Sequence, residues 1–280
     1  MHENDLLPCM RSLTHGDCLE VMPDILGNSI DLTVTSPPYD DLRNYGDSSS
    51  GWCEGQWKKI MMELYRVTTD GGVVVWVVAD ATSKGSESGT AFRQALFAMS
   101  CGFNLHDTMI YQKDNPPPVG GSNRYYQDFE YMFVFSKGKP RVFNALTRKR
   151  RNKHNDIRTH RVKGFTRNKD GEFTKSLVSL TGDVKIGNCW KYVVGGGNSV
   201  ECGVKHPATF PEKLVEDHIL SWTNTGDTVF DPMMGSGTTG KSAIRNDRKF
   251  IGIEIVREYF DIAEGRIPHK VVSRRKSQSV

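Results

Sequence analysis

The chain has 280 residues, of which 37% are hydrophobic and 25% charged, and its formal net charge is +4. This length can bury a full core, as one large α/β domain or a domain with an insertion. No apolar run approaches the roughly 18 residues needed to span a membrane. The N-terminus lacks a basic-then-apolar signal pattern, which indicates a cytoplasmic protein. Six scattered cysteines without CxxC spacing indicate reduced thiols and give no support to a metal site.

Hydrophobic spacing predicts strands that alternate with helices along the chain. The first expected elements are a strand over Arg11–His15, a helix over Cys18–Leu26, a strand up to Thr35, a helix over Gln56–Val67 and a strand over Val73–Ala79. They are followed by a helix over Ala91–Met99 and by strands over Asn104–Tyr111 and Phe129–Phe135. The last are a helix over Glu212–Trp222, a strand over Asp227–Phe230, a helix over Thr238–Arg245, a strand over Lys249–Ile253 and a helix over Val256–Arg266. This alternation predicts an α/β fold with a mostly parallel sheet and helices on both faces.

Two stretches mark where expected strands end. Ser29–Asp40 reads SIDLTVTSPPYD, and its strand cannot continue through Pro37–Pro38 because proline has no N–H and a fixed φ. Far downstream, Asp231–Gly240 reads DPMMGSGTTG directly after a short strand. In an open α/β sheet, ligands bind outside the carboxyl ends of the strands. We therefore expect both stretches to contribute to a binding site.

The second stretch also contains GSGTTGKS, which matches the P-loop pattern at Gly235–Ser242. A P-loop nucleoside triphosphatase would place Lys241 on the phosphates and Ser242 on magnesium. Too little chain remains after Ser242 to build the rest of such a fold, and Asp231 at the strand end would repel a triphosphate. We keep the P-loop enzyme as a distant alternative.

Acidic residues, rather than cations, surround this glycine turn. Asp231 ends one expected strand, Glu254 ends the next, and Asp17 follows a third. An acid at the end of the second strand of a nucleotide-binding unit accepts hydrogen bonds from ribose hydroxyls. Three carboxylates without a basic cradle favour a cationic nucleoside without phosphates, and S-adenosylmethionine, with its sulfonium, is such a molecule.

A strongly basic segment interrupts the α/β pattern. Between Arg148 and Lys169 there are ten lysines and arginines against one acid, Asp156, and few apolar residues. Cations at this density repel one another unless a polyanion neutralises them, which predicts steeply salt-dependent binding to duplex nucleic acid. The residues we expect to bind DNA are Arg148, Lys149, Arg150, Arg151, Lys153, Arg158, Arg161 and Lys163.

Together, TSPPY at Thr35–Tyr39 and DPMMGSGTT at Asp231–Thr239 resemble the motifs of the β-class amino-group DNA methyltransferases, which act on cytosine N4 or adenine N6. GDCLEV, FEYMFVFSKG, HPATFPEKL and FIGIEI agree with the same family. The resemblance implies a Rossmann-like, seven-stranded, mostly parallel sheet with circularly permuted motif order. It also implies a catalytic half over 1–138, a target-recognition insert over 139–203, a cofactor-binding half over 204–267 and a basic, disordered tail over 268–280.

The resemblance assigns roles to particular residues. The expected cofactor is S-adenosylmethionine, without a metal, and the residues expected to bind it are Asp17, Thr35, His206, Phe210, Asp231, Pro232, Gly235, Ser236, Gly237, Thr238 and Glu254. This family often has lysine where this chain has Phe210, so the contacts of that segment differ. The residues expected at the reaction centre are Ser36, Pro37, Pro38 and Tyr39.

An exocyclic amine is a poor nucleophile because its lone pair is conjugated into the ring. The Ser36 hydroxyl and the Pro37 carbonyl can accept its hydrogens while it attacks the methyl group, and Tyr39 can stack on a base flipped from the duplex. A covalent intermediate is unnecessary, and Cys9, which precedes the whole fold, is a poor candidate for the thiolate of a cytosine C5 enzyme.

In this family, serine at the first position of the motif goes mostly with cytosine N4 and aspartate with adenine N6. Ser36 therefore favours cytosine N4 in double-stranded DNA, with adenine N6 as the alternative. An RNA substrate stays open. A catalytically silent DNA-binding protein on the same scaffold has no support in the sequence, because the cofactor and acceptor motifs are intact, and a methylation assay decides between it and the enzyme. Further candidate partners are a restriction endonuclease counterpart and a second copy of the chain.

Overall fold

The computed structural model describes residues 11–38, 52–116, 123–149, 161–179, 183–193 and 211–269, with the backbone alone for 161–167 and 174–179. The chain forms two compact units. The first contains residues 1–144 and 188–280, and the second contains residues 145–187. Some residues with predicted roles lie outside the described residues, so the predictions made for them stay predictions. They are Tyr39, His206, Phe210, Arg150, Arg151, Lys153, Arg158 and the tail from residue 270.

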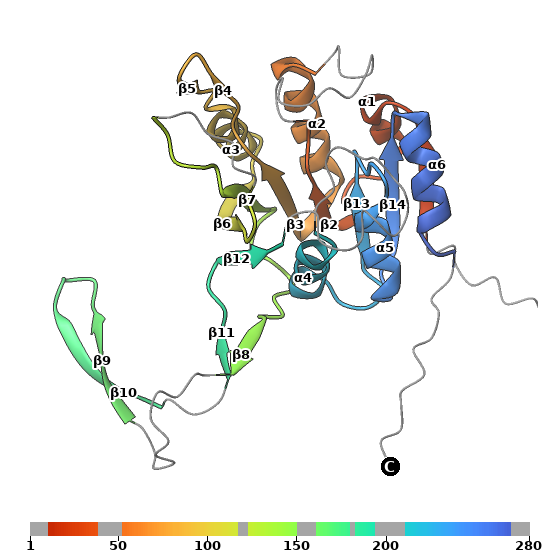
Figure 1. Ribbon diagram of the computed structural model, residues 1–280. Coiled ribbons are helices and arrows are strands. Elements are labelled where there is room, and N and C mark those ends of the chain that lie inside the picture. Colours follow the sequence, from red (N-terminus) through yellow and green to blue (C-terminus); the bar gives the residue numbers. More distant parts are fainter. Residues whose placement is uncertain are drawn as a thin grey trace, which may run out of the picture. The chain divides into compact units, whose positions relative to one another are not determined.

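An eight-stranded sheet forms the centre of the first unit (Figure 1). Its strand order is β1-β14-β13-β2-β3-β7-β6-β12. β7 runs antiparallel to both of its neighbours, β3 and β6, and every other neighbouring pair is parallel. The strands are β1 (Arg11–His15), β2 (Ile30–Thr35), β3 (Thr68–Val78), β6 (Asn104–Lys113), β7 (Phe129–Ser136), β12 (Cys189–Tyr192), β13 (Thr228–Asp231) and β14 (Lys249–Glu254).

The expected mostly parallel α/β sheet is confirmed, but the expected number of seven strands is wrong. The eighth strand is β12, which pairs with β6 from Cys189↔Ile110 to Tyr192↔Lys113. It lies within residues 139–203, which the sequence analysis assigned to the insert. Four residues of mixed polarity carry no readable period, and the partner strand is about eighty positions away in the chain, so local pattern could not reveal this pairing.

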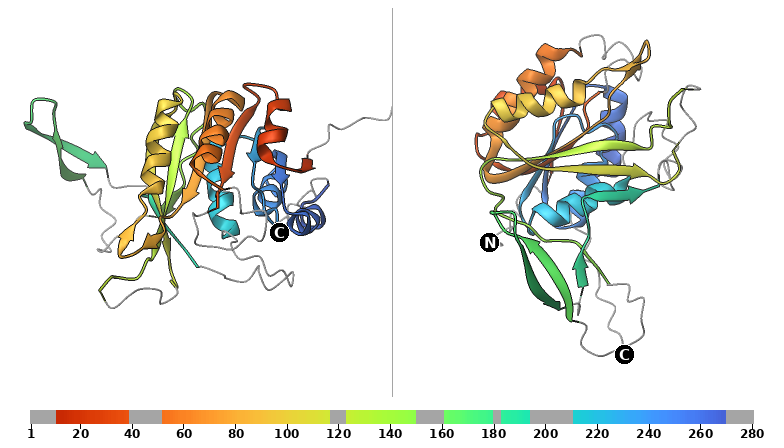
Figure 2. Two further views of the ribbon diagram at one scale, coloured as in Figure 1. Left: turned by 90° about the horizontal axis from the view of Figure 1, so that it is seen from above. Right: turned by 90° about the vertical axis from the view of Figure 1, so that its left-hand side faces the viewer.

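Helices cover both faces of the sheet (Figure 2). The first group is α1 (Cys18–Val21), α2 (Glu54–Val67) and α3 (Thr90–Ser100), and the second is α4 (Glu212–Trp222), α5 (Thr238–Arg245) and α6 (Arg257–Arg266). The helix expected over Cys18–Leu26 is shorter than predicted, because a 3-10 turn over Met22–Asp24 follows α1. Pro23 lies in that turn and has no N–H to continue an α-helix.

The core lies between the sheet and these helices. Residues Val73 to Val78 of β3 are all nearly inaccessible to solvent, so this strand is buried on both faces. That burial explains its continuous apolar sequence. Trp76 is completely buried, and its indole N–H donates to Gln94 Oε1 on α3 over 2.9 Å, which satisfies the one polar atom of the ring.

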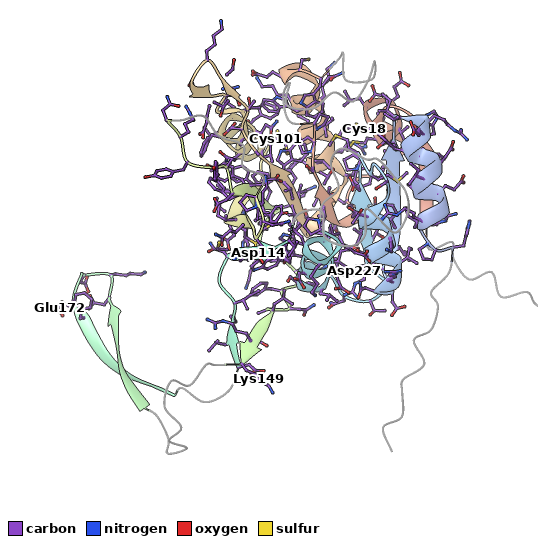
Figure 3. The ribbon with its side chains drawn as sticks, viewed as in Figure 1. Cys18, Cys101, Asp114, Lys149, Glu172 and Asp227 are labelled. Carbon is purple, nitrogen blue, oxygen red and sulfur yellow. The ribbon has the colours of Figure 1, made fainter. Side chains whose placement is uncertain are left out.

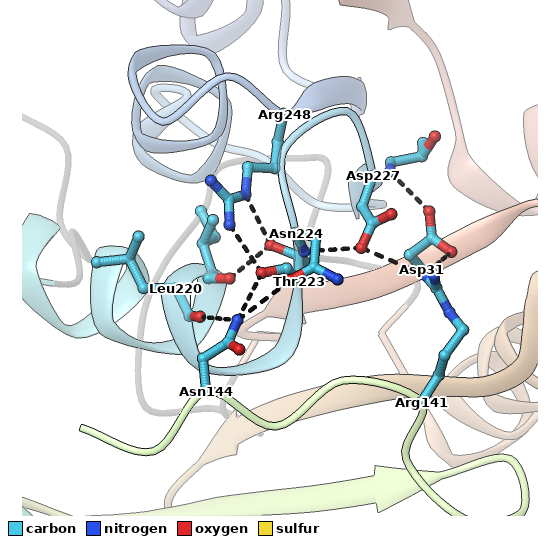
Figure 4. Close-up of polar contacts among 10 residues, drawn as sticks. Asp31, Arg141, Asn144, Leu220, Thr223, Asn224, Asp227 and Arg248 are labelled. Carbon is cyan, nitrogen blue, oxygen red and sulfur yellow. Dashed lines mark hydrogen bonds and ion pairs between the residues drawn. The ribbon is translucent and has the colours of Figure 1, made fainter.

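A polar network ties together the amino ends of the two central strands (Figure 4). Arg141 Nη2 lies 2.7 Å from Asp31 Oδ1 on β2 and 3.2 Å from Asp227 Oδ2 just before β13. Asp31 Oδ2 also accepts the N–H of Thr228 over 2.8 Å. Asn144 Nδ2 donates to the carbonyls of Leu220 and Thr223, both at 3.1 Å. The network therefore fixes β2, β13 and the end of α4 relative to one another.

The described residues of the second unit form two antiparallel strand pairs. β8 (Thr147–Lys149) pairs with β11 (Asp183–Lys185), and β9 (Arg161–Arg167) pairs with β10 (Phe173–Ser179). Figure 3 labels Lys149 on β8 and Glu172 in the β9–β10 turn. Asn168 Oδ1 accepts the N–H groups of Asp170 and Glu172 and so stabilises that turn. In the part of the chain that the structure describes, no helix is long and apolar enough to cross a membrane.

Candidate active site

The sheet changes its direction of winding between β13 and β2. From β13 the chain passes through α5 to β14 on one side, and from β2 it passes through α2 to β3 on the other. These crossovers diverge, so the carboxyl ends of β13 and β2 lie at a topological switch point, the usual place for a ligand in an open α/β sheet. The strands pair in parallel through Val229↔Leu32 and Phe230↔Thr33. TSPPY and DPMMGSGTT therefore begin side by side.

Asp231 joins the two motifs directly. Its Oδ1 accepts the hydroxyl of Thr35 over 2.8 Å, and its Oδ2 accepts the hydroxyl of Thr239 over 2.7 Å. The N–H of Met233 donates to Oδ1 over 3.1 Å. These bonds link the ends of β2 and β13 to the first turn of α5, so the diproline and glycine turns are held together by a buried carboxyl group.

Burial dominates the protonation of this carboxyl. Asp231 is only 2% exposed, and desolvation raises its pKa from 3.8 to about 7, although the three hydrogen bonds act in the opposite direction. Glu254 adds a repulsive charge that raises the pKa further. Asp231 therefore changes charge near neutral pH, and any cation bound nearby would favour its ionised form.

The glycine turn requires its glycines. Gly235 and Gly237 have φ values of 52° and 81°, in the left-handed region that glycine adopts without strain. A Cβ on Gly237 would lie 2.9 Å from both Ala263 Cβ and Ile267 Cδ1, so α6 packs directly against this backbone. Arg266 on α6 donates to the carbonyl and the hydroxyl of Ser236, both at 2.7 Å, which holds the turn from the other side.

Glu254, at the end of β14, holds the same turn through backbone N–H groups. Its Oε2 accepts from Gly235 over 2.7 Å and its Oε1 accepts from Val256 over 2.8 Å. Burial raises its pKa. A carboxylate has about four acceptor positions, so two described bonds leave capacity for ribose hydroxyls. The N–H of Gly16, at the end of β1, donates to the Glu254 carbonyl over 2.9 Å, which brings the Asp17 strand end beside Glu254.

Asp17 has a structural role in the described residues. It is the N-cap of α1, and its Oδ1 accepts the N–H of Leu19 over 2.8 Å. The three acids thus lie at the carboxyl ends of neighbouring strands: Asp17 follows β1, Glu254 ends β14 and Asp231 ends β13. Pro232, in the turn between β13 and α5, and Thr238, the first residue of α5, are both buried. The acids are brought to one edge of the sheet, as the sequence predicted from their positions at strand ends.

The residues expected at the reaction centre are described only up to Pro38. Ser36 is half-buried and Pro37 is buried directly after β2. Among the cations expected to bind DNA, Arg148 and Lys149 are exposed on β8, where they pair with Val184 and Asp183. For Arg161 and Lys163 the structure gives only the backbone, in β9. Their predicted DNA contacts stay predictions.

Three residues that matter at this edge were missed by the sequence analysis. Thr239 was quoted only as part of a motif, although its hydroxyl binds Asp231. Arg266 showed no signal, since it lies thirty positions from its partner Ser236. Asp80 directly follows the apolar run of β3 and is 9% exposed, and its Oδ1 accepts from Ser88 Oγ and the Ala91 N–H over 3.0 and 2.9 Å. The signal that the sequence offered for Asp80 was an acidic residue directly after a buried apolar strand.

The surroundings of Lys241 argue against a P-loop. Lys241 Nζ lies 2.9 Å from Glu212 Oε2 on α4, and both side chains are largely buried. Arg245 Nη1 binds the other oxygen of Glu212 over 2.8 Å. The lysine that would hold phosphates is therefore engaged by a carboxylate on a neighbouring helix, and the Gly235 N–H that would face a phosphate donates to the Glu254 carboxylate instead.

We predict that Lys241→Met leaves the affinity for S-adenosylmethionine within about twofold of the unaltered protein. Glu212 keeps Arg245 as a partner, so the loss of stability is small, about 1 kcal/mol, which corresponds to about 2 °C in Tm for a chain of this length. Calorimetry and isothermal titration measure both, with exposed Lys249→Met as the matched control. ATP hydrolysis by the unaltered protein that disappears in Lys241→Met would contradict this assignment.

Among the described residues, no group of three or more His, Cys, Asp or Glu could hold a metal ion. The free thiols Cys18 and Cys101 are labelled in Figure 3. Burial raises the pKa of the Cys18 thiol to about 12, so it is a packed, unreactive group. The described groups that gather at this edge are the carboxylates of Asp231 and Glu254, the hydroxyls of Thr35 and Thr239, and backbone N–H groups.

Comparison with known proteins agrees with this geometry. The DNA methylase family N6_N4_Mtase matches residues 30–265, and the chain belongs to this family. It is accordingly a DNA methyltransferase that uses S-adenosylmethionine and acts on an amino group. The orphan methyltransferase M.BamHII of Bacillus amyloliquefaciens is 52% identical over 256 residues, which cover 89% of this chain and 93% of the relative. The type II methyltransferase M2.LlaDCHI of Lactococcus lactis subsp. cremoris is 30% identical and covers 91% of this chain and 88% of its own.

Solved structures show the same fold. The cytosine-N4-specific PvuII DNA methyltransferase has a TM-score of 0.69 at 23% identity, covering 92% of this chain and 86% of its own. The complex of M1.HpyAVI with its cofactor SAM has a TM-score of 0.60 at 25% identity, covering 91% of this chain and 98% of its own. The Rossmann-like methyltransferase fold expected from the sequence is confirmed.

Proposed function

We propose that this enzyme transfers a methyl group from S-adenosylmethionine directly to the exocyclic N4 of a cytosine flipped out of duplex DNA. The observation that carries the proposal is the buried contact between Thr35 and Asp231, at 2.8 Å. This contact holds the diproline motif and the glycine motif at one switch point. The groups that accept the amino hydrogens and the turn that binds the cofactor are then close enough to position the same reacting atoms.

The residues at the carboxyl edge fit the cofactor. Asp17, Asp231 and Glu254 supply acceptors and negative charge, and the one lysine of the turn, Lys241, is engaged by Glu212. When bound, S-adenosylmethionine supplies an electrophilic methyl group on a positively charged sulfonium. The negative charge of these acids favours the binding of this cation over the binding of a phosphate. We assign Glu254 to the ribose and the backbone of residues 232–238 to the body of the nucleoside, with His206 and Phe210 as further contacts. M1.HpyAVI, solved in complex with SAM, supports this choice of cofactor.

Ser36 and Pro37 act on the target amine. The Ser36 hydroxyl and the Pro37 carbonyl each accept a hydrogen of the amine, which frees the nitrogen lone pair from the ring. The lone pair then attacks the methyl carbon while the carbon–sulfur bond breaks and sulfur keeps the electron pair. One amine proton leaves to solvent through these acceptors, so nitrogen ends neutral. Pro38 follows directly in the chain, and we assign Tyr39 to stacking on the flipped base.

The inserted segment reads the DNA. We assign target recognition to residues 139–203, whose cations, including Arg148 and Lys149, are attracted to phosphates. Residues 145–187 of this segment belong to a compact unit of their own. A partner restriction endonuclease, a homodimer and a location in the cytoplasm of a bacterial or phage-infected cell are consistent with such an enzyme. The type II name of M2.LlaDCHI favours the endonuclease partner.

The identity of the methylated base is tested by mass spectrometry. We expect duplex DNA incubated with the protein and S-adenosylmethionine to yield N4-methylcytosine after digestion to nucleosides, because Ser36 rather than aspartate begins the diproline motif. A denatured protein and a reaction without cofactor are the controls, and an RNA duplex tests the other nucleic acid. If N6-methyladenine were the sole product, the target base would be adenine and not cytosine. If no duplex yielded a methylated base, the proposed function would be overturned.

A further inference from the structure

A second surface feature lies at the same edge of the sheet as the candidate active site. β6 and β3 both run antiparallel to β7, so they point in the same direction, and β6 ends at the carboxyl edge at Lys113. The loop from β6 to β7 therefore leaves from that edge. Its described last part contains Arg124, Tyr125 and Tyr126, and the Lys113 N–H donates to the Asp128 carbonyl over 2.6 Å, closing the base of the loop.

Two neighbouring tyrosines in this loop are unusually exposed. Tyr125 is 102% exposed and Tyr126 is 58% exposed, so neither ring is buried against the fold. A single exposed aromatic residue is ordinary, but adjacent aromatic rings at the edge of a binding site mark a contact surface. A half-exposed phenylalanine, Phe92 on α3, lies 5.3 Å from the ring of Tyr131 on β7, so aromatic surface continues onto the neighbouring elements.

Arg124 attaches this loop to the segment that follows β3. Its Nη2 donates to the carbonyl of Gly85, and its Nη1 lies 3.9 Å from Glu87 Oε1. Gly85 and Glu87 belong to the short hairpin of β4 (Thr82–Ser83) and β5 (Ser86–Glu87), which begins four residues after the end of β3. β3 is the direct neighbour of β2, whose end carries Ser36. These contacts hold the loop with the tyrosines against the hairpin that follows β3, at the same carboxyl edge of the sheet as Ser36.

The chemistry of this surface fits a nucleic acid. Tyrosine rings stack on bases of any sequence, and exposed Lys84 adds a cation to the hairpin. When a base is flipped out, its former neighbours lose a stacking partner, and the cost of extrusion is lowest when something replaces it. A planar side chain beside the reaction centre can supply that replacement.

We propose that Tyr125 and Tyr126 stack on the DNA bases left exposed when the target base leaves the duplex, and so stabilise the extruded state. This inference rests on the proposed function. The two tyrosines are positioning residues, since they act on the bases next to the target and not on the reacting amine. Arg124 holds their loop against the hairpin.

The test compares Tyr125→Ala/Tyr126→Ala with Tyr125→Phe/Tyr126→Phe in the full chain, on a duplex that contains a site found by sequencing methylated DNA. On this matched duplex, we expect the alanine pair to lower kcat/KM by about ten-fold or more, since the loss of even one base–aromatic stack costs that much, and the phenylalanine pair to stay within twofold. A second duplex places an abasic site opposite the target, so extrusion breaks no base pair. There we expect the alanine pair to come within about threefold of the unaltered enzyme.

Leu26→Ala is the matched control, because Leu26 is 78% exposed and precedes β2 at the opposite edge of the sheet. Cofactor affinity and the melting temperature of all variants should match those of the unaltered protein. An equal loss on both duplexes, or no loss on either, overturns this inference. Failure of the unaltered protein to methylate any duplex would instead overturn the proposed function, so the two failures are distinguishable.

Discussion

Ser36→Ala is expected to reduce kcat for methyl transfer by about 10²- to 10³-fold or more, the usual effect of removing one preorganised hydrogen-bonding group at a reaction centre. Ser36 follows β2 immediately and precedes buried Pro37, so its position is fixed by the sheet and by the rigid proline backbone. Without the hydroxyl, one amine hydrogen loses its acceptor and the nitrogen lone pair stays conjugated with the ring. The lost interaction belongs to the transition state, so KM for DNA should change little.

Affinity for S-adenosylmethionine separates this role from a structural one. The cofactor turn is held by Asp231, Glu254 and Arg266, none of which uses the Ser36 side chain in the described contacts. We therefore expect the cofactor dissociation constant of Ser36→Ala to stay within about twofold. Ser29→Ala is a matched control, since Ser29 lies at the other end of the same strand, where its hydroxyl donates to the Leu26 carbonyl over 2.6 Å. Near-normal kcat in Ser36→Ala would remove serine from the reaction centre.

Strong local patterns made much of the fold predictable. α4 and α5 begin and end at the residues that the sequence predicted, Glu212–Trp222 and Thr238–Arg245, because one has clear apolar spacing and the other follows a glycine turn. The neighbourhood of Thr35 and Asp231 could also be anticipated, since parallel strands bring their carboxyl ends to one edge. The chemical connection is the buried carboxyl group of Asp231, which accepts hydrogen bonds from both Thr35 and Thr239. This connection follows only from the strand register.

Contacts between distant segments were beyond the sequence. β12 joins the sheet through a partner far away in the chain, and no periodicity in four residues announces it. Arg266 looked like one of many basic residues near the end of a helix, and its contact with Ser236 depends on how α6 crosses the turn. Asp31 and Arg141 are similar, since an acid in a strand and a basic residue in a loop become a pair only when β2 and the loop after β7 meet. Tertiary packing decides such pairs.

Asp231→Asn is expected to remove a pH dependence from both cofactor binding and stability. In the unaltered protein, burial raises the pKa of Asp231 to about 7, and a sulfonium bound at this edge would favour the ionised carboxylate. The apparent affinity for S-adenosylmethionine should then rise about ten-fold between pH 6 and pH 8, as the free protein loses the competing proton. Asp231→Asn should bind more weakly at pH 8, with an affinity that varies by less than about twofold over this range.

Asparagine can occupy this position without disrupting it. Its Oδ1 can accept from Thr35 and from the Met233 N–H, as Asp231 does at 2.8 and 3.1 Å. Its amide can donate to Thr239, whose hydroxyl hydrogen can turn to the Val34 carbonyl, 3.4 Å from that oxygen. The variant therefore tests charge rather than shape. Asp227→Asn, at the opposite end of β13, is the matched control, since its carboxylate binds the Asn224 N–H and Arg141.

Stability should respond to pH in the opposite sense to cofactor affinity. A carboxyl whose pKa rises from 3.8 in the unfolded chain to about 7 in the fold binds its proton more tightly when folded, so its stabilising contribution is complete below pH 3.8 and is lost as pH rises through 7. Its full size is about 4 kcal/mol. Glu254, whose pKa burial also raises, is present in both proteins, so the difference between the unaltered protein and Asp231→Asn reports on Asp231. Denaturant unfolding measures this difference in the free energy of unfolding. If the difference did not decline between pH 4 and pH 7, Asp231 would be ionised over the whole range. The cofactor would then have no proton to displace.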